Sequence, residues 1–423
     1  MRRGALFVLA AGLVAGGAGA ASEPAGYRPE TWFHLIGGNV SKAGLTADLE
    51  AVSSAGFGGV QLFHGQVGSR EAWPGTAEQI PCLSPKWEET VRHAADECRR
   101  LGLSFKMQNC PGWSMSGGPW IGLDRCMRQL DVRAAVATGG VVAVDLPVGE
   151  AQHPPHDWRD IRTVAYPLVA GEAEPLPPPV AATSPDSAWL ASNALAIVTS
   201  ALKAPGRAPV GIRAAPGAAT LAFDYAAPVT ARTLEITSPR RMNHGRSYRP
   251  DVSVTLSCEE ADGWRPVGNW QMPRSNWQDD APLSLSFPRT TARRWRVRFD
   301  FRHPFFVDSV RLVGAARPQN WEGLSGRVLR ARMDDAPSVA DEPADCVDPA
   351  QVRDVSRFLD LTSGVLRCEL PPGRWRILRI GHVNAGLKNQ HAPAEATGWE
   401  CDKLSETGVE ASFAGYIGRL TAP

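Results

Sequence analysis

Polar side chains follow three short apolar segments in the first third of the chain, namely Asn39, His64 and Asn109. Amides and imidazoles donate and accept hydrogen bonds, and pairs of sugar hydroxyl groups require such partners. The loop after Asn109 adds Trp113 and Ser116. An indole ring packs well against the C–H face of a sugar ring. This combination of side chains indicates binding of a polyhydroxylated ring.

Each of these residues also has a structural interpretation. Asn109 can cap a turn, Trp113 can plug the mouth of a barrel, and an isolated histidine such as His64 is often buried and hydrogen-bonded in a core. The sequence leaves both interpretations open. Ligands of parallel α/β folds bind at the carboxyl ends of the strands, which is where these side chains are expected.

A second group of polar residues surrounds Glu400 and Asp402, in the run Trp-Glu-Cys-Asp-Lys. Asp402 can serve as the N-cap of the last helix, whereas Glu400 has no comparable structural role. The sequence contains no G-x-S-x-G, H-E-x-x-H or G-x-x-x-x-G-K-[ST] motif. Serine hydrolases, zinc proteases and P-loop enzymes are therefore disfavoured.

Alternating strands and helices are predicted for residues 27–130, and these elements must position the polar groups. Thr46 is the expected N-cap of the first helix. Ser84 is the expected N-cap of the second helix, with Pro85 at its first position, and Gly102 is its expected end. Such βα units imply a parallel sheet, as in a TIM-type barrel or a doubly wound fold. The expected strands are 32–36, 60–64 and 103–108, and the expected helices are 46–55 and 85–101.

The pattern changes after residue 131. A proline-rich segment, 170–186, reads as a stiff linker, and residues 188–314 alternate with a period of two. The latter pattern predicts a β-sandwich of six or more strands with no helix. Strands over 365–370 and 375–380 are expected to meet at a tight Pro371-Pro372-Gly373 turn, and helical spacing returns over 402–420. Three strands cannot close an eight-stranded barrel, so the sheet is either open or incomplete within this sequence.

The composition is that of a globular protein. The 423 residues include 45 Lys+Arg and 44 Asp+Glu, giving a net charge of +1, with 43% hydrophobic and 21% charged residues. These values exclude a disordered chain, and a near-neutral sequence without a basic tract argues against nucleic acid as a partner. The 14 Trp residues against 5 Tyr suit either sugar stacking or a sandwich core.

The first twenty residues resemble an export signal. Arg2 and Arg3 precede an apolar stretch, 5–15, and Ala18-Gly19-Ala20 is an A-x-A cleavage site, so the mature chain is predicted to begin at Ala21 in the periplasm or outside the cell. No stretch is long enough to span a membrane. Export permits disulfides among the eight cysteines, but buried free thiols are an equally good interpretation, and the sequence selects no pairing.

Several motifs of the sequence occur together. They are Trp32 to Asn39, Gly44 to Ala51, Gly58 to Phe63, Leu83-Ser84-Pro85, Asn109 to Ser114, Ser116 to Trp120, and Glu400 to Ser405. This combination resembles glycoside hydrolase family 106, whose activity is α-L-rhamnosidase. The resemblance covers about 27–135 and 352–420, and the middle sandwich is similar to galactose-binding or discoidin-like domains, with 291–298 resembling a late strand.

The resemblance implies a (β/α)8 catalytic barrel, only partly present here and interrupted by the sandwich. It further implies inverting hydrolysis of a rhamnose-containing oligosaccharide or glycoside, by two carboxyl groups roughly 6.5–9.5 Å apart. That pair is expected beyond Pro423, so that this sequence is an N-terminal portion and Glu400 and Asp402 are substrate-side or calcium-side groups. Calcium is the implied cofactor, without assigned ligands.

The predicted organisation is a signal peptide (1–20), the first part of the barrel (21–135), connecting strands and linker (136–187), an inserted sandwich (188–315), a β-rich connection (316–382) and a return to the barrel (383–423). A non-catalytic secreted carbohydrate-binding protein, with the sandwich as lectin, is the alternative. A third possibility is a complete enzyme that uses Glu400 with another carboxylate such as Glu395.

Overall fold

The computed structural model divides into two compact units. Unit 1 comprises Met1–Val132, Val148–Ile161 and Ile380–Pro423, and unit 2 comprises Arg133–Pro147 and Arg162–Arg379. The predicted signal peptide, 1–20, lies outside the described residues. No helix among the described residues has the length and apolar character needed to cross a bilayer. The described residues are 27–66, 79–148, 157–169, 171–172, 175–199, 210–212, 217–237, 252–273, 281–302, 305–325, 328 and 342–421.

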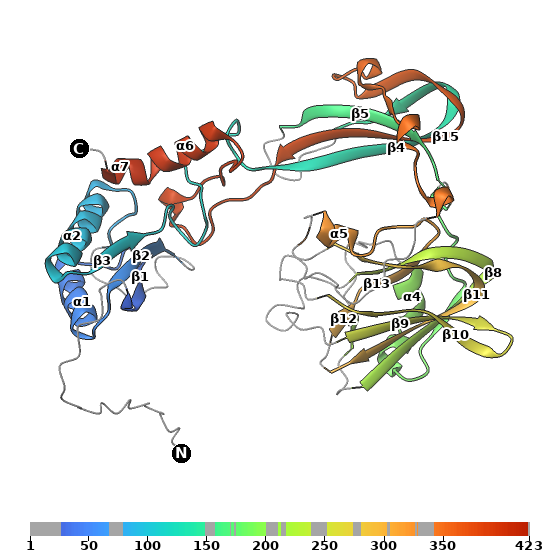
Figure 1. Cartoon of the computed structure of the whole chain (residues 1–423), viewed down its shortest axis with the longest axis horizontal. Helices are drawn as coiled ribbons and strands as arrows, with labels where there is room; N and C mark the ends of the chain where they lie inside the picture. Colours follow the sequence, from blue (N-terminus) through green and yellow to red (C-terminus); the bar gives the residue numbers. More distant parts are fainter. Residues whose placement is uncertain are drawn as a thin grey trace. The chain divides into compact units, whose positions relative to one another are not determined.

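Unit 1 is built around a three-stranded parallel sheet. The strands are β1 (Glu30–Ile36), β2 (Gly59–Gly65) and β3 (Ser104–Met107), in that order across the sheet (Figure 1). Glu30 pairs with Gly59, and Gly59 with Ser104, so the three strands begin in register and end at one edge. This is the parallel arrangement that alternating strands and helices predict.

Helices α1 (Lys42–Ser54) and α2 (Pro85–Leu101) connect the strands. The predicted cap of α2 is confirmed, since the Ser84 hydroxyl accepts a hydrogen bond from Trp87 N and Gly102 ends the helix in the left-handed conformation. The predicted start of α1 at Thr46 is wrong. Ser41 is the cap, because its Oγ accepts from Gly44 N at 3.1 Å, and the helix therefore begins earlier than predicted.

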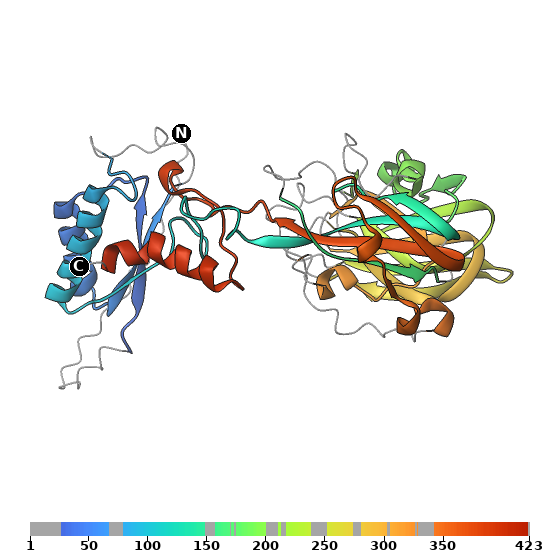
Figure 2. The ribbon, with the colours of Figure 1, turned by 90° about the horizontal axis from the view of Figure 1, so that it is seen from above.

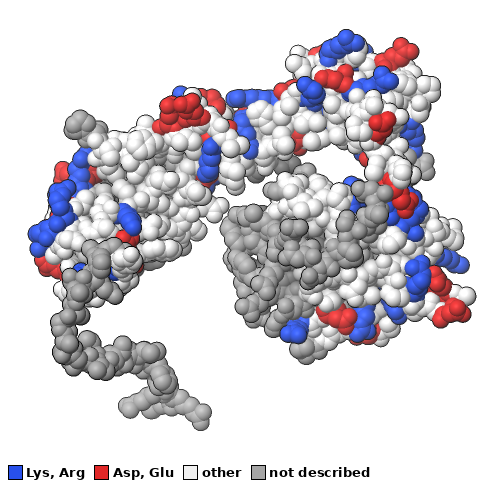
Figure 3. Space-filling view, in the orientation of Figure 1, with Lys and Arg blue, Asp and Glu red and all other residues white. Residues whose placement is uncertain are grey.

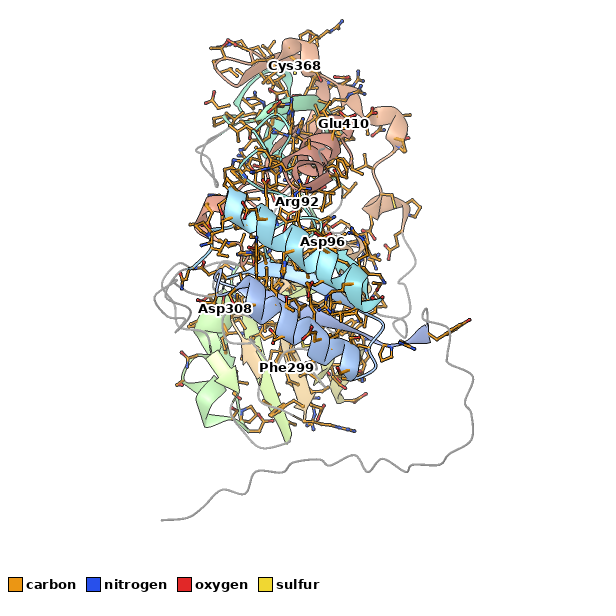
Figure 4. The ribbon with its side chains drawn as sticks, turned by 90° about the vertical axis from the view of Figure 1, so that its left-hand side faces the viewer. Arg92, Asp96, Phe299, Asp308, Cys368 and Glu410 are labelled. Carbon is orange, nitrogen blue, oxygen red and sulfur yellow. The ribbon has the colours of Figure 1, made fainter. Side chains whose placement is uncertain are left out.

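Both helices cover the same face of the sheet (Figure 2) and lie side by side in Figure 4, where Arg92 and Asp96 mark the exposed side of α2. The covered face contributes Leu35, Val60 and Leu62 to a core that also contains residues of both helices. On the opposite face, Trp32 remains 65% exposed. Because parallel sheets are normally covered on both faces, this asymmetry is unusual.

The last helices, α6 (Glu406–Gly415) and α7 (Ile417–Thr421), return to this unit. The predicted N-cap, Asp402, is wrong: Ser405 Oγ accepts from Gly408 N, whereas Asp402 Oδ1 accepts from Leu404 N in the preceding turn. Arg419 then donates to the carbonyl of Leu83 and pairs with Glu88, which attaches α7 to the beginning of α2.

Unit 2 contains a six-stranded antiparallel sheet with the path β10-β9-β11-β8-β13 and β6 beside β8. Its core includes Phe223, Phe287, Trp295 and Phe299, each no more than 1% exposed. A small pair, β7 with β12, accompanies the sheet. The bounds are β6 (Ala181–Thr183), β7 (Val210–Ile212), β8 (Gly217–Thr237), β9 (Val252–Glu260), β10 (Gly263–Gln271), β11 (Leu283–Phe301), β12 (Phe305–Val307) and β13 (Ser309–Val313).

Two predictions for this region are wrong. Short helices α3 (Ala188–Ala191) and α4 (Ala194–Thr199) occur where no helix was expected, and their Leu190 and Ile197 are buried in the sandwich core. The predicted linker also contains strand β6, which pairs with β8, so part of it is sheet. Side chains of these elements pack into or against the sandwich core, and this tertiary packing outweighs the local sequence pattern.

A second, four-stranded sheet follows the order β14-β5-β15-β4, with bounds β4 (Arg128–Asp145), β5 (Arg159–Pro167), β14 (Arg353–Asp354) and β15 (Val365–Asn384). The tight turn expected at Pro371-Pro372-Gly373 is wrong, since β15 runs through it, with Gly373 at a φ of +124°. The remaining short helices are α5 (Trp321–Leu324) and 3₁₀ turns at Pro343–Asp345, Pro349–Gln351, Ser356–Phe358 and Ala394–Ala396.

Candidate functional site

The carboxyl ends of β1–β3 are crossed by a segment that arrives from the far end of the sequence. Trp113 N donates to Gln390 O at 2.9 Å, and Gln66 N donates to His391 O at 2.6 Å. Gly118 N donates to Trp399 O at 3.2 Å. These backbone bonds attach residues 384–405, which we call the return segment, to the loop after β3 and to the residue that follows β2. The predicted site residues of both groups thus come from one unit.

Glu400 and Ser116 meet directly. Ser116 Oγ donates to Glu400 Oε2 at 2.7 Å, and Lys403 Nζ lies 2.7 Å from the same oxygen. Ser116 is 6% and Glu400 8% exposed. The second carboxylate oxygen, Oε1, makes no hydrogen bond to any described residue. Glu400 therefore has one anchored oxygen and one that can accept a further hydrogen bond.

Two amide side chains near the strand ends likewise have one hydrogen-bonded atom and one without a partner among the described residues. Asn39 Nδ2 donates to Ile36 O at 3.2 Å, and Gln108 Nε2 donates to Ser114 O at 2.8 Å. Their carbonyl oxygens, Asn39 Oδ1 and Gln108 Oε1, are buried and have no partner within the described ranges. Buried acceptors are normally satisfied, so each of these oxygens calls for a donor such as a hydroxyl group.

Trp113 supplies an exposed aromatic surface in the same region. Its side chain is 43% exposed, and its ring centroid lies 4.7 Å from that of His391 and 6.3 Å from that of His34. Gly65 lies beneath it, since a Cβ there would come within 3.7 Å of the indole. The ring is thus held on one side and open on another, as stacking on a sugar face requires.

The other predicted residues contribute differently. His64 is 1% exposed, and its Nδ1 accepts from Trp87 Nε1 at 2.8 Å, which is the structural interpretation. Asn109 is exposed and makes no hydrogen bond within the described chain. Asp402 is half-buried and stabilises the turn before α6. Of the seven predicted residues, Ser116 and Glu400 are therefore the pair in direct contact.

Burial controls the charge of the nearby thiol. Desolvation, together with the nearby Glu400 carboxylate, raises the pKa of Cys110 to about 12. The thiol is therefore neutral, and its Sγ donates to Ser114 O at 3.0 Å. A thiol in this state is a structural donor and a poor nucleophile.

A second polar cluster lies at the start of the return segment. Arg128 donates from Nε to His382 Nδ1 and forms an ion pair with Asp157. Desolvation lowers the pKa of His382, and the positive charges of Arg128 and Arg159 lower it further. The imidazole is accordingly held neutral, as an acceptor for the arginine.

Three residues of the site were not among the predicted site residues: Gln108, Lys403 and His391. Gln108 precedes the predicted Asn109, and because successive strand residues point to opposite faces, a choice between them needed the sheet orientation. Lys403 lies three residues after Glu400, a spacing visible in the sequence. His391 had no signal beyond its type.

The described residues contain no acidic, histidine or cysteine cluster of the kind that holds a metal ion. Within these ranges no three His, Cys, Asp or Glu side chains come together in a metal-binding group. One oxygen of Glu400 is bound to the Lys403 ammonium group, and Asp402 Oδ1 accepts from Leu404 N in a turn. The calcium dependence implied by the family resemblance stays a prediction.

Surface charge in the visible face is mixed. Figure 3 shows lysine and arginine side chains interspersed with acidic ones over the described residues. Some of the surface ion pairs join residues close in the sequence, such as Arg99 with Asp96 and Arg298 with Asp300. This view offers no basic field of the type that guides nucleic acid.

A family model described as alpha-L-rhamnosidase, that of glycoside hydrolase family 106, matches residues 21–422. The chain belongs to this family of glycoside hydrolases. The solved structure of a rhamnosidase from Novosphingobium sp. PP1Y is similar over 94% of this chain, with a TM-score of 0.67 and 26% identity. A putative beta-glucuronidase of Formosa agariphila is 35% identical over 147 residues, or 34% of this chain. The chain spans 37% of the solved rhamnosidase and 12% of the beta-glucuronidase.

Proposed function

We propose that the polypeptide containing these residues hydrolyses α-L-rhamnosidic bonds and that unit 1 holds part of the sugar. The carrying observation is the pair of buried carbonyl oxygens of Asn39 and Gln108, which have no donor within the described residues. Family membership supports the choice of a glycoside, and the rhamnosidase neighbour supports rhamnose.

In this proposal each group has a defined part. The oxygens of Asn39 and Gln108, together with Glu400 Oε1, accept hydrogen bonds from sugar hydroxyls. Trp113 packs against the C–H face of the ring. Ser116 and Lys403 fix the carboxylate of Glu400 by its other oxygen, so that its orientation is set before the sugar arrives.

We assign the chemical step to carboxyl groups outside this sequence. An inverting hydrolase needs one acid to protonate the leaving oxygen and one carboxylate to activate water, roughly 6.5–9.5 Å apart. Glu400 is poorly suited to be the acid, since two donors already occupy one of its oxygens. Its proposed role is therefore substrate binding.

The finer fold proposal is a (β/α)8 barrel completed by further strands. The sheet face opposite α1 and α2 supports it, because Trp32 on that face is 65% exposed although its ring contacts His34 edgewise and Phe63 at a tilt. In a barrel this face points inward and is filled by side chains of other strands. The rhamnosidase neighbour, of which this chain spans 37%, is long enough to supply them.

We also propose export to the periplasm or beyond. The positive residues, the apolar stretch and the A-x-A site of residues 1–20 support this location. The family match begins at residue 21, where the mature chain is predicted to start.

A carbohydrate-binding role for unit 2 is the second candidate, favoured by a cavity of 470 Å³. Prolines of the segment 175–179 line one side, and Tyr225, Arg317 and Arg376 also face it. Arg317 lies 3.2 Å from Glu235, which also pairs with Arg311, so two guanidinium groups share one carboxylate. The size suits a small ligand.

The function is tested with an aryl α-L-rhamnoside. We expect the 423-residue chain to release negligible L-rhamnose, and a polypeptide extended to the length of the solved rhamnosidase to release it with inverted configuration, observed by NMR. If the 423-residue chain hydrolyses the rhamnoside and Glu400→Gln abolishes that hydrolysis, Glu400 would instead be catalytic. Absence of hydrolysis by the extended polypeptide would contradict the proposal.

A further inference from the structure

Cys126 and Cys401 face each other across an isolated antiparallel bridge. The backbone hydrogen bonds lie before and after the pair and do not join the two cysteines themselves. Opposite residues in such a non-hydrogen-bonded position have Cα atoms about 4.5 Å apart, with side chains on the same face. A disulfide accepts Cα separations of about 4.4–6.8 Å. The flanking bonds are Asp402 N to Arg125 O at 2.8 Å and Met127 N to Glu400 O at 2.7 Å.

The two thiols share one buried apolar cluster. Cys126 is 1% and Cys401 2% exposed, and Ile121 lies with them, with Trp120 and Trp399 packed against the group. Both cysteines are free thiols in this structure. The burial protects the sulfur atoms from small-molecule adducts, while each thiol has the other cysteine opposite it.

The arrangement differs from that of another buried cysteine. Cys258 also lies in antiparallel strands, but its cross-strand partners are Trp295 and Arg265. That thiol packs as a small hydrophobic group in the sandwich core. The strand register therefore places a cysteine opposite Cys126 but no cysteine opposite Cys258.

We propose that Cys126 and Cys401 form a disulfide when the chain meets an oxidising thiol buffer. One thiolate attacks a sulfur of an external disulfide, either oxidised glutathione or an oxidoreductase, and releases one thiol. The second thiolate then attacks the mixed disulfide, which forms the Cys126–Cys401 bond and releases a second thiol. Two protons and two electrons leave the protein, and the external disulfide becomes two thiols. Because both sulfurs are buried, the exchange takes place during folding or local opening.

The bond would fasten the return segment to the loop that carries Ser116. Glu400 directly precedes Cys401, and its contact with Ser116 joins residues 284 positions apart. A covalent link beside that contact limits the separation of the two segments. The proposal concerns the covalent state of unit 1 and is independent of which glycoside is cleaved.

Peptide mapping tests the assignment. The full chain is equilibrated in a glutathione redox buffer, remaining thiols are blocked in denaturant, and trypsin is added. Cleavage at arginine and lysine separates 126–128 and 389–403, each with one cysteine, from 107–125, which contains Cys110. We expect a linked pair of 126–128 with 389–403, lighter by two hydrogen atoms than the separate peptides and absent after reduction.

Matched variants keep the test decisive. In Cys126→Ser the peptide 389–403 should carry the blocking group, whereas in Cys258→Ser the linked pair should persist. Alkylation of both Cys126 and Cys401 in the oxidised wild type would overturn the proposal. A link between Cys401 and Cys110 in place of Cys126 would overturn it equally.

Discussion

The two units of this chain bury the apolar side chains of their sheets to different extents. In unit 2 the antiparallel sheet encloses a large apolar core, with Phe223, Trp295 and Phe299 no more than 1% exposed. In unit 1 the parallel sheet is covered by helices on one face, while Trp32 on the other is 65% exposed. The buried carbonyl oxygens of Asn39 and Gln108, which have no partner among the described residues, also belong to unit 1, whereas the corresponding buried atoms of unit 2 are arginine Nε and hydroxyl groups.

The difference indicates that unit 2 has a self-contained core, whereas unit 1 presents a surface for binding. The buried apolar core of the sandwich stabilises unit 2 from within. An exposed apolar face and unsatisfied carbonyl oxygens, as in unit 1, are features of surfaces that bind protein or a ligand. Each prediction below would remove or sharpen this contrast.

The largest effect is expected from Trp295→Ala in unit 2. The side chain is fully buried, and a cavity of this size should lower the free energy of unfolding by about 3–5 kcal/mol. Trp264→Ala is the control, because this half-buried ring lies on the surface beneath Arg296, 4.6 Å from its centroid, and should cost about 1 kcal/mol or less. Urea unfolding followed by hydrogen exchange resolves the two units. Equal losses in both variants would contradict the packed-core description.

An intermediate effect is expected from Ser116→Ala in unit 1. The change removes one donor from Glu400 and loosens its orientation, so L-rhamnose binding should weaken by about 1–2 kcal/mol. Ser253→Ala is the matched control, since that hydroxyl donates to Gln271 in unit 2. Calorimetric titration measures both. A larger loss in the control than in Ser116→Ala would place the sugar outside unit 1.

The pairing of βα elements was predictable because it depends on local signals. Ser84, Pro85 and Gly102 specify the ends of α2 directly. The start of α1 was misplaced because Ser41 and Thr46 are both suitable caps and the apolar pattern does not separate them. The contact between Ser116 and Glu400 spans 284 positions, so only the folded chain reveals which donor meets which carboxylate.

The smallest effect is expected from pH, through His382. Its pKa is lowered in the folded chain, so the unfolded state binds more protons as pH falls through the usual value of 6.5, and stability decreases toward acid. His382→Gln keeps an acceptor for Arg128 and should reduce this decrease. Urea midpoints of both proteins at about pH 7.5 and about pH 5 measure it. If the urea midpoint falls by the same amount between the two pH values in His382→Gln as in the wild type, other groups cause the decrease in stability.

Titration of the chain with L-rhamnose tests the central claim most directly. In Gln108→Leu the buried acceptor is lost, whereas Gln271→Leu removes an amide of unit 2 that likewise donates to a backbone carbonyl. The account predicts binding that Gln108→Leu weakens about tenfold and Gln271→Leu leaves unchanged. Binding that survives Gln108→Leu but is lost in Arg317→Gln would contradict it and place the sugar in the cavity of unit 2.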